Sequence, residues 1–196
     1  MIKGDETRER IMEAARDLFH RRGYYNTSIN DIIQSTGVKK GNLYFHIQSK
    51  DKLIIEVLKE GLVIYEKQIY EGLDNFNSTE KILKIIDAIR KFHINDDLLK
   101  GCIFGNMALE IGLDGSEISL FVKNVFERWV SFLEKLLIRA EGNGELRLKE
   151  SPSALARMII ASIEGSVMLS KISGNADSLN DCSSFIRSVI EERKIL

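Results

Sequence analysis

The chain has 196 residues, of which 44% are hydrophobic, which is enough for a packed core and argues against disorder. A single proline and 14 glycines leave long stretches without helix breakers, so the composition favours an all-α fold. The formal net charge of −1 neither indicates nor excludes a nucleic-acid partner, but the charge is unevenly distributed. Residues 1–53 contain ten Lys and Arg against seven Asp and Glu, so the small N-terminal end is the basic one.

The two cysteines and the N-terminus bear on the cellular compartment. Cys102 and Cys182 are far apart and form no Cys-x-x-Cys pair, as expected of reduced thiols rather than of a disulfide scaffold. The first residues lack the apolar stretch of a secretory signal. No segment approaches the roughly 20 consecutive apolar residues that a membrane span requires. We expect a soluble, cytoplasmic protein without a membrane partner.

The N-terminal part of the sequence predicts three helices in close succession. Residues 5–22 have apolar residues at helical spacing, and Gly23 is placed to end this helix. Ser28 and Asp31 form a Ser-x-x-Asp capping pattern at the start of the second helix. That helix should end at Gly37, because glycine readily takes the left-handed conformation that closes a helix. A short third helix follows at once, which gives the order helix, tight turn, helix.

The remainder of the chain predicts longer helices. Ser49 can cap a helix over residues 49–72, whose length suits a connector between two domains. Turn-forming dipeptides separate five further predicted helices, at residues 78–94, 98–112, 116–141, 152–173 and 178–194. Ser151 and Pro152 fit the N-cap and the first helical position. We therefore predict about nine helices in two domains, 1–48 and 49–196.

One stretch of sequence indicates a function. It is Gly37-Val38-Lys39-Lys40-Gly41-Asn42-Leu43-Tyr44-Phe45-His46-Ile47-Gln48-Ser49-Lys50, preceded by Gly23-Tyr24 and Thr27-Ser28-Ile29. This stretch resembles the DNA-binding domain of the TetR family. The resemblance is dense over residues 5–58, and beyond them the total length, the helix count and the final pair of helices agree. It implies a three-helix helix-turn-helix domain that binds double-stranded operator DNA, followed by a helical domain for ligand binding and dimerisation.

Nine residues are candidates for DNA contacts. A helix of about two turns that starts with two lysines and Gly41 can approach base edges closely, and Asn42 can bond adenine through two hydrogen bonds. The resemblance assigns Lys39, Lys40, Gly41 and Asn42 to the positions that face bases. It assigns mainly backbone contacts to Thr27, Ser28, Tyr44, His46 and Lys50. The alternative is that Tyr44 and His46 pack inside the small domain and the lysines are merely solvated.

Two positions in this stretch depart from the commonest family pattern. Ile47 stands where phenylalanine is frequent, and Asn42 stands where a small or hydroxylated residue is frequent. The second departure leaves the operator sequence open, because Asn42 is one of the residues expected to face bases.

The more acidic remainder of the chain is where a small-molecule effector would bind. Methionine and aromatic side chains suit irregular apolar pockets, so five residues are candidates for the pocket of a partly apolar effector: Phe104, Met107, Trp129, Phe132 and Met168. The alternative for each is an ordinary core position. Glu110 and Glu164 lie on otherwise apolar helices and, if buried, can meet a cationic or hydroxylated ligand; otherwise they reach solvent.

The last two predicted helices contain more apolar surface than one subunit needs. By resemblance, they form the interface of a homodimer, whose twofold symmetry matches a palindromic operator. We therefore expect a DNA-binding repressor that a small molecule releases from its operator.

Two other classes of function are alternatives to a DNA-binding repressor. The sequence contains no Gly-rich phosphate loop, no Gly-x-Ser-x-Gly and no His-Glu-x-x-His, and its histidines share no ligand spacing with the cysteines. We therefore predict no catalytic, metal or cofactor site. A second alternative is a helical protein-interaction module that has lost DNA binding. The intact lysine, tyrosine and histidine positions argue against it.

Overall fold

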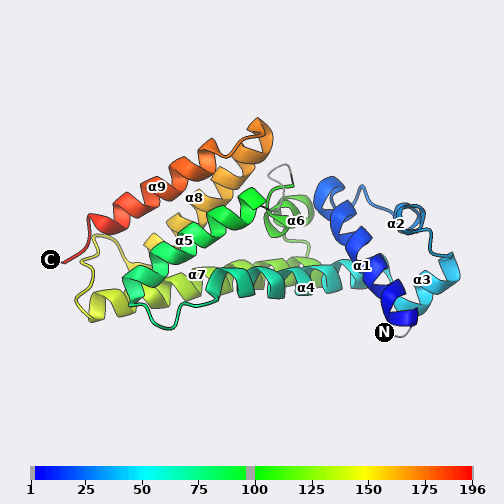
Figure 1. The fold of residues 1–196 in the computed structure, drawn as a ribbon, viewed down its shortest axis with the longest axis horizontal. Helices are drawn as coiled ribbons and strands as arrows, with labels where there is room; N and C mark the ends of the chain where they lie inside the picture. Colours follow the sequence, from blue (N-terminus) through cyan, green and yellow to red (C-terminus); the bar gives the residue numbers. More distant parts are fainter. Residues whose placement is uncertain (1–2, 96–99, 196) are drawn as a thin grey trace. The chain divides into compact units, whose positions relative to one another are not determined.

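The computed structural model describes residues 3–95 and 100–195, and these residues form nine α-helices (Figure 1). The helices are α1 (Lys3–Arg22), α2 (Ile29–Thr36), α3 (Lys40–His46), α4 (Lys50–Tyr70), α5 (Ser78–Asn95), α6 (Ile103–Ile111), α7 (Glu117–Gly142), α8 (Pro152–Ser173) and α9 (Asp177–Glu191). The extended backbone in this part of the chain amounts to one isolated bridge, between Leu146 and Lys194. The predicted all-α fold is confirmed.

The capping residues determine where several helices begin and end. At the start of α2, the Ser28 hydroxyl accepts the Asp31 N–H at 3.1 Å while the Asp31 carboxylate accepts the Ser28 N–H at 2.7 Å. Gly37 ends the same helix in the left-handed conformation, with φ of 67°. Ser151 caps α8, and Pro152 occupies its first turn. These ends were predicted from the sequence, and the structure confirms them.

Three helices are shorter than predicted. The segment predicted as 98–112 corresponds to α6, which begins only at Ile103, since Gly101 has a left-handed φ of 72°; residues 98 and 99 lie outside the described residues. The helix predicted to reach residue 72 ends at Tyr70, just before Gly72 with φ of 73°. The helix predicted to reach residue 194 ends at Glu191, because the carbonyl of Arg193 accepts the N–H of Arg147 at 2.8 Å and so leaves the helical hydrogen-bond pattern.

The chain separates into two compact units. The first consists of Met1–Val63 and Ile103–Lys123, and the second of Ile64–Cys102 and Asn124–Leu196. We call them the N-terminal unit and the C-terminal unit. The predicted division into domains 1–48 and 49–196 stays a prediction.

An apolar core holds α1, α2, α3 and the first part of α4 together in the N-terminal unit. Fully buried side chains from these helices form it: Ile11, Phe19, Ile32, Leu43, Leu53, Ile54 and Leu58. Arg8 and Arg16 of α1 add ion pairs to Glu56 and Glu60 of α4, at 2.6 to 3.4 Å. Exposed pairs of this kind contribute up to about 1 kcal/mol each, whereas one buried Ile, Leu or Phe contributes about 1.5–3 kcal/mol. The apolar core therefore dominates the stability of this unit.

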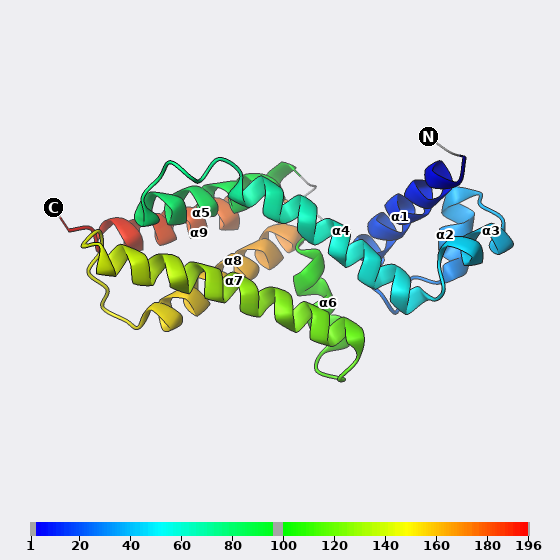
Figure 2. The same ribbon diagram turned by 90° about the horizontal axis from the view of Figure 1, so that it is seen from below.

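In the C-terminal unit, α9 packs against both α8 and α5 (Figures 1 and 2). The buried side of α5 consists largely of isoleucine: Ile82, Ile85, Ile86 and Ile89. At the edge of this contact, Arg187 of α9 pairs with Asp87 of α5 at 2.8 Å. The last third of α4 and most of α7 complete the unit.

Helix α8 is long and largely apolar. In the described part of the chain, it is the one helix whose length and composition would allow it to cross a membrane, with a mean hydropathy of 1.3. A core helix of a soluble protein passes the same test. Arg157, Glu164 and Lys171 interrupt the apolar sequence of α8, so it contains no continuous apolar span of membrane length.

Candidate functional site

Helix α3 has one buried and one exposed side. Leu43 is fully buried, and Val38 and Ile47, which flank the helix, are almost fully buried as well. These three apolar anchors hold the opposite side toward solvent. The exposed side includes five of the residues predicted to contact DNA: Lys39, Lys40, Gly41, Asn42 and Tyr44. A short helix that projects two lysines, an amide and a phenol from one face is suited to contacts with base edges and phosphates.

Phe45 belongs to the same exposed side, and the sequence pattern did not single it out. It is 85% exposed, and its ring meets the His46 ring edge to face with centroids 5.1 Å apart. The signal was available, because position 45 lies opposite the buried positions 43 and 47 on a helix. An exposed apolar ring on such a face can contact the methyl group of thymine.

The four remaining candidates for DNA contact differ in their surroundings. Thr27 is fully buried, and its hydroxyl donates to the carbonyl of Gly23 at 2.8 Å, so this side chain supports the fold. The Ser28 hydroxyl caps α2, and His46 at the end of α3 is half-buried. The Lys50 ammonium lies 4.1 Å from the centre of the Tyr24 ring, and partial burial lowers its pKa.

Within the N-terminal unit, a carboxylate of α6 forms hydrogen bonds with the backbone of the turn between α1 and α2. The two carboxylate oxygens of Glu110 accept the backbone N–H groups of Tyr24 and Tyr25 at 2.8 and 2.7 Å. From the sequence, Glu110 was a possible ligand contact. In the structure its carboxylate instead satisfies two backbone donors beyond the end of α1.

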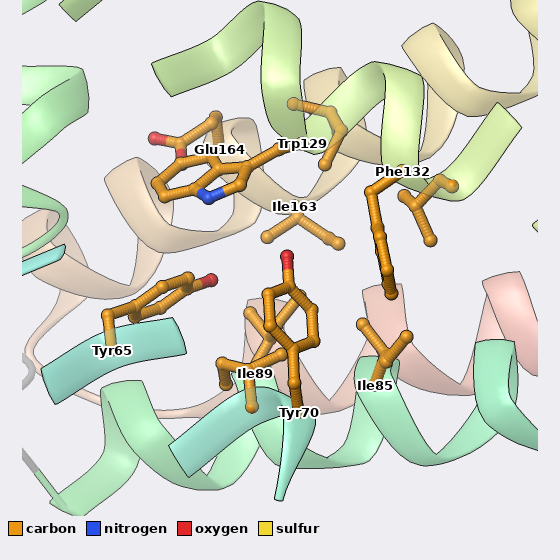
Figure 3. Close-up of a pocket in the computed structure, with 11 residues that line it drawn as sticks. Tyr65, Tyr70, Ile85, Ile89, Trp129, Phe132, Ile163 and Glu164 are labelled. Carbon is orange, nitrogen blue, oxygen red and sulfur yellow. The ribbon is translucent and has the colours of Figure 1, made fainter. Parts of the chain in front are cut away.

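The C-terminal unit contains an internal cavity between helices α4, α5, α7 and α8 (Figure 3). The space open to the centre of a water molecule is about 20 Å³, enough for about one water. The hydroxyl of Tyr70 points into this space (Figure 3). Eleven residues line it: Tyr65, Ile69, Tyr70, Ile85, Ile89, Trp129, Phe132, Leu133, Ile160, Ile163 and Glu164.

Comparison with known proteins decides the family. Residues 11–57 match the N-terminal domain of the bacterial regulatory proteins of the tetR family. Residues 78–184, more than half of the chain, match the C-terminal domain of LmrA/YxaF-like transcriptional regulators. The chain belongs to the TetR family of transcriptional regulators.

Relatives along the whole chain agree with this family. The HTH-type transcriptional regulator LmrA of Bacillus subtilis is 31% identical, over 97% of this chain and all of the relative. The HTH-type transcriptional repressor DhaR of Mycobacterium sp. strain GP1 is 26% identical, over 88% of this chain and 86% of the relative. The crystal structure of a TetR transcriptional regulator from Chloroflexus aurantiacus superimposes on this structure with a TM-score of 0.89 and 30% sequence identity. The superposition covers 99% of this chain and 98% of the Chloroflexus chain.

The family assignment decides between the classes of function considered for the sequence. The matched domains and relatives are DNA-binding transcriptional regulators, so the enzymatic alternative is rejected. In this TetR-family regulator, the residues matched to the N-terminal domain, 11–57, include all of α2 and α3, so α3 is the candidate recognition helix, the one expected to enter the major groove of DNA.

The structure separates the five residues predicted for the effector pocket of this TetR-family regulator. Trp129 and Phe132 line the cavity. Phe104 and Met107 are buried in α6, which belongs to the N-terminal unit. Met168 of α8 is about half exposed and does not line the cavity. Their roles as ligand contacts stay predictions, and the structure favours Trp129 and Phe132.

The acidic residue of the cavity is Glu164 on α8. The side chain is partly exposed, but its carboxyl group lies among apolar side chains, and this loss of water raises its pKa to about 7. A hydrogen bond from the Cys102 thiol opposes the shift only in part. The carboxyl group is therefore half ionised near neutral pH, unlike a solvated glutamate.

Proposed function

We propose that this TetR-family protein is a cytoplasmic repressor whose homodimer binds a palindromic operator and is released from it by a small molecule. The observation that supports this most directly is the exposed side of α3, which presents Lys39, Lys40, Asn42 and Tyr44 beside a bare Gly41. DhaR, whose name describes a repressor, supports repression rather than activation.

The proposed DNA contacts divide into two groups. Lys39, Lys40, Gly41 and Asn42 face bases, and Phe45 adds an apolar contact beside them. The remaining contacts are to the DNA backbone and come from residues around α3: Thr27, Ser28, Tyr44, His46 and Lys50. The hydroxyls of Thr27 and Ser28 take part in hydrogen bonds within the fold, and their backbone N–H groups donate to Tyr24 and Asp31. A phosphate contact from either residue would therefore share or replace one of these hydrogen bonds.

The proposed dimer interface is the exposed apolar surface of the last two helices. Ile172 of α8 is 77% exposed and Phe185 of α9 is 64% exposed, and three further apolar side chains of α8 are about half exposed: Met158, Met168 and Leu169. Clustered apolar surface of this kind marks an interface, and a twofold-symmetric one places two recognition helices on half-sites. The half-sites should lie about one helical turn or a multiple of it apart.

Selection of bound sequences from a random duplex DNA library tests the function. The purified full-length protein is expected to enrich a palindrome at moderate salt. Enrichment of a single half-site would contradict the dimer. If nothing is enriched by a folded and dimeric protein, the alternative of a protein-interaction module that has lost DNA binding is favoured.

Effector binding is expected to lower operator affinity about 5- to 150-fold at saturation, as is typical of allosteric coupling. Helix α4 begins at the DNA-binding domain and contributes Tyr65 and Tyr70 to the cavity, so ligand entry is expected to tilt this helix. Such a tilt would change the separation of the two recognition helices. The measurement is operator affinity with and without saturating effector. A ligand that fills the cavity but leaves operator affinity unchanged would contradict this mechanism.

Gly41→Ala is expected to weaken operator binding about 10- to 100-fold while leaving the fold intact. A Cβ at Gly41 meets no atom within 4 Å in the free protein, so stability should be unchanged or higher by up to about 1 kcal/mol. On DNA, the same methyl group would stand between α3 and the bases. Gly61→Ala in α4 is the matched control, since its Cβ also meets open space. If Gly41→Ala and Gly61→Ala bind the operator with equal affinity, α3 does not approach the bases closely at Gly41.

A further inference from the structure

The cavity of the C-terminal unit contains few polar groups, and none of them is basic. Its lining includes one carboxyl group, from Glu164, and two phenol hydroxyls, from Tyr65 and Tyr70. The other lining residues are isoleucine, leucine, phenylalanine and tryptophan, without Lys, Arg or His. An anionic ligand would lose its hydration here without gaining an opposite charge, so the lining disfavours it.

Glu164 has no cationic partner within the protein as far as the structure describes it. None of the ion pairs in residues 3–95 and 100–195 includes it; the acidic partners in the pairs of the C-terminal unit include Glu66, Asp87, Glu150 and Glu191 instead. Its carboxyl group accepts a hydrogen bond from the Cys102 thiol, which is a weak donor. A carboxylate in apolar surroundings needs a nearby cation to offset its lost hydration. A ligand can supply that cation.

Aromatic rings from α4 and α7 line the cavity together with this carboxyl group (Figure 3). The rings of Tyr65 and Trp129 have centroids 5.1 Å apart, and those of Tyr70 and Phe132 have centroids 4.6 Å apart. The faces of such rings attract a cation within about 6 Å, and they also pack against the apolar body of a ligand. The carboxyl group and the rings therefore favour the same kind of ligand group.

An open cleft adjoins the cavity within the same unit. The cleft has a volume of about 760 Å³ and is lined by polar residues of α4 and α7, and it shares Tyr70, Trp129 and Phe132 with the cavity. Because Tyr70 and Phe132 are only half-buried, rotation of these two rings would join the cleft to the cavity. Some such opening is required, since the closed cavity has room for about one water.

We propose that the cavity binds an organic cation, an amine or quaternary ammonium ion with an apolar aromatic body, whose positive group pairs with Glu164 and lies against Tyr65 and Trp129. The cation enters from the cleft between α4 and α7, past Tyr70 and Phe132. This inference rests on the proposed function, because it names the chemical class of the effector.

The test compares two probes of the same shape on the full-length protein. Benzyltrimethylammonium has a positive charge, and neopentylbenzene is its neutral carbon isostere. Trp129 is the only tryptophan of the chain and lines the cavity, so its fluorescence reports binding directly. The variant is Glu164→Gln, and the matched control is Asp74→Asn, which removes one negative charge from an exposed position outside the cavity.

The wild type and the Asp74→Asn variant are expected to bind the cation with equal affinity, and Glu164→Gln should bind it at least about tenfold more weakly. The neutral isostere should bind the wild type more weakly than the cation does and should not distinguish Glu164→Gln from the wild type. Tyr65→Leu, which keeps the carboxyl group and removes one ring, should weaken binding of the cation more than binding of the isostere. This second variant provides the test if Glu164→Gln does not fold.

Three results would overturn the proposal: no binding of the cation to the wild type, equal cation affinity in the wild type and Glu164→Gln, or an isostere that binds the wild type as tightly as the cation. Operator affinity, measured in parallel, separates this inference from the proposed function. A cation that binds through Glu164 without changing operator affinity supports the site and contradicts its role as an effector site. A neutral compound that binds in the cavity and releases the protein from its operator supports the proposed function. It contradicts the proposal that the effector is a cation.

Discussion

Glu164→Gln is expected to stabilise the folded protein by up to about 3 kcal/mol at pH 8 and by less than about 1 kcal/mol at pH 5. Burial of the carboxyl group raises its pKa from 4.5 in a solvated glutamate to about 7 in the folded state. Between these two values the folded protein binds more protons than the unfolded chain, so stability falls as the pH rises. Glutamine resembles the protonated carboxyl group in shape and does not ionise. The variant therefore lacks the cost of burying a charge at high pH.

The measurement is the free energy of unfolding of both proteins by urea at several pH values, without added ligand. Other groups titrate alike in the two proteins, so the difference between them isolates Glu164. The nearby Tyr65 phenol does not interfere, because burial raises its pKa well above the ordinary value. Asp74→Asn is expected to change stability little at any of these pH values, since residue 74 is exposed. A difference between the wild type and Glu164→Gln that is the same at pH 5 and pH 8 would show that this carboxyl group is not desolvated.

The ends of most helices could be predicted because local chemistry determines them. Ser28 with Asp31, Gly37, and Ser151 with Pro152 act within one turn of the chain, and a linear sequence displays such short-range patterns fully. The end of α9 could not be read in the same way. It depends on the hydrogen bond between Arg193 and Arg147, which are far apart in the sequence.

The candidate sites were predictable to different extents for the same reason. The DNA-binding side of α3 is one short segment, so its residues could be identified together, although the exposure of Phe45 was missed. The cavity is assembled from four helices, and helical periodicity does not say which helix faces which. Residue type alone therefore predicted Trp129 and Phe132 as pocket residues. It did not predict Tyr65 and Tyr70, which also line the cavity. Phe104 and Met107 have the same residue types, but α6 belongs to the other compact unit.

Gly23→Ala is expected to destabilise the protein by about 2–4 kcal/mol, considerably more than an ordinary substitution at the end of a helix. Gly23 has a left-handed φ of 84°, which strains any residue with a side chain. In addition, its new Cβ would lie 2.5 Å from an oxygen of Glu110. The Glu110 side chain can move away, but it would then release the backbone N–H groups of Tyr24 and Tyr25. Loss of these two charge-assisted hydrogen bonds is the larger part of the expected effect.

Gly37→Ala separates the two contributions. Gly37 has a similar left-handed φ of 67°, but a Cβ added there would meet no atom within 4 Å, so this variant should lose only about 1 kcal/mol from backbone strain. Glu110→Ala completes a double-mutant cycle, measured by urea unfolding. In the Glu110→Ala background, Gly23→Ala should cost no more than Gly37→Ala does in the wild type, because the carboxylate is already absent. If Gly23→Ala costs as much with Glu110 as without it, the carboxylate does not fasten the turn between α1 and α2, and backbone strain alone explains the glycine.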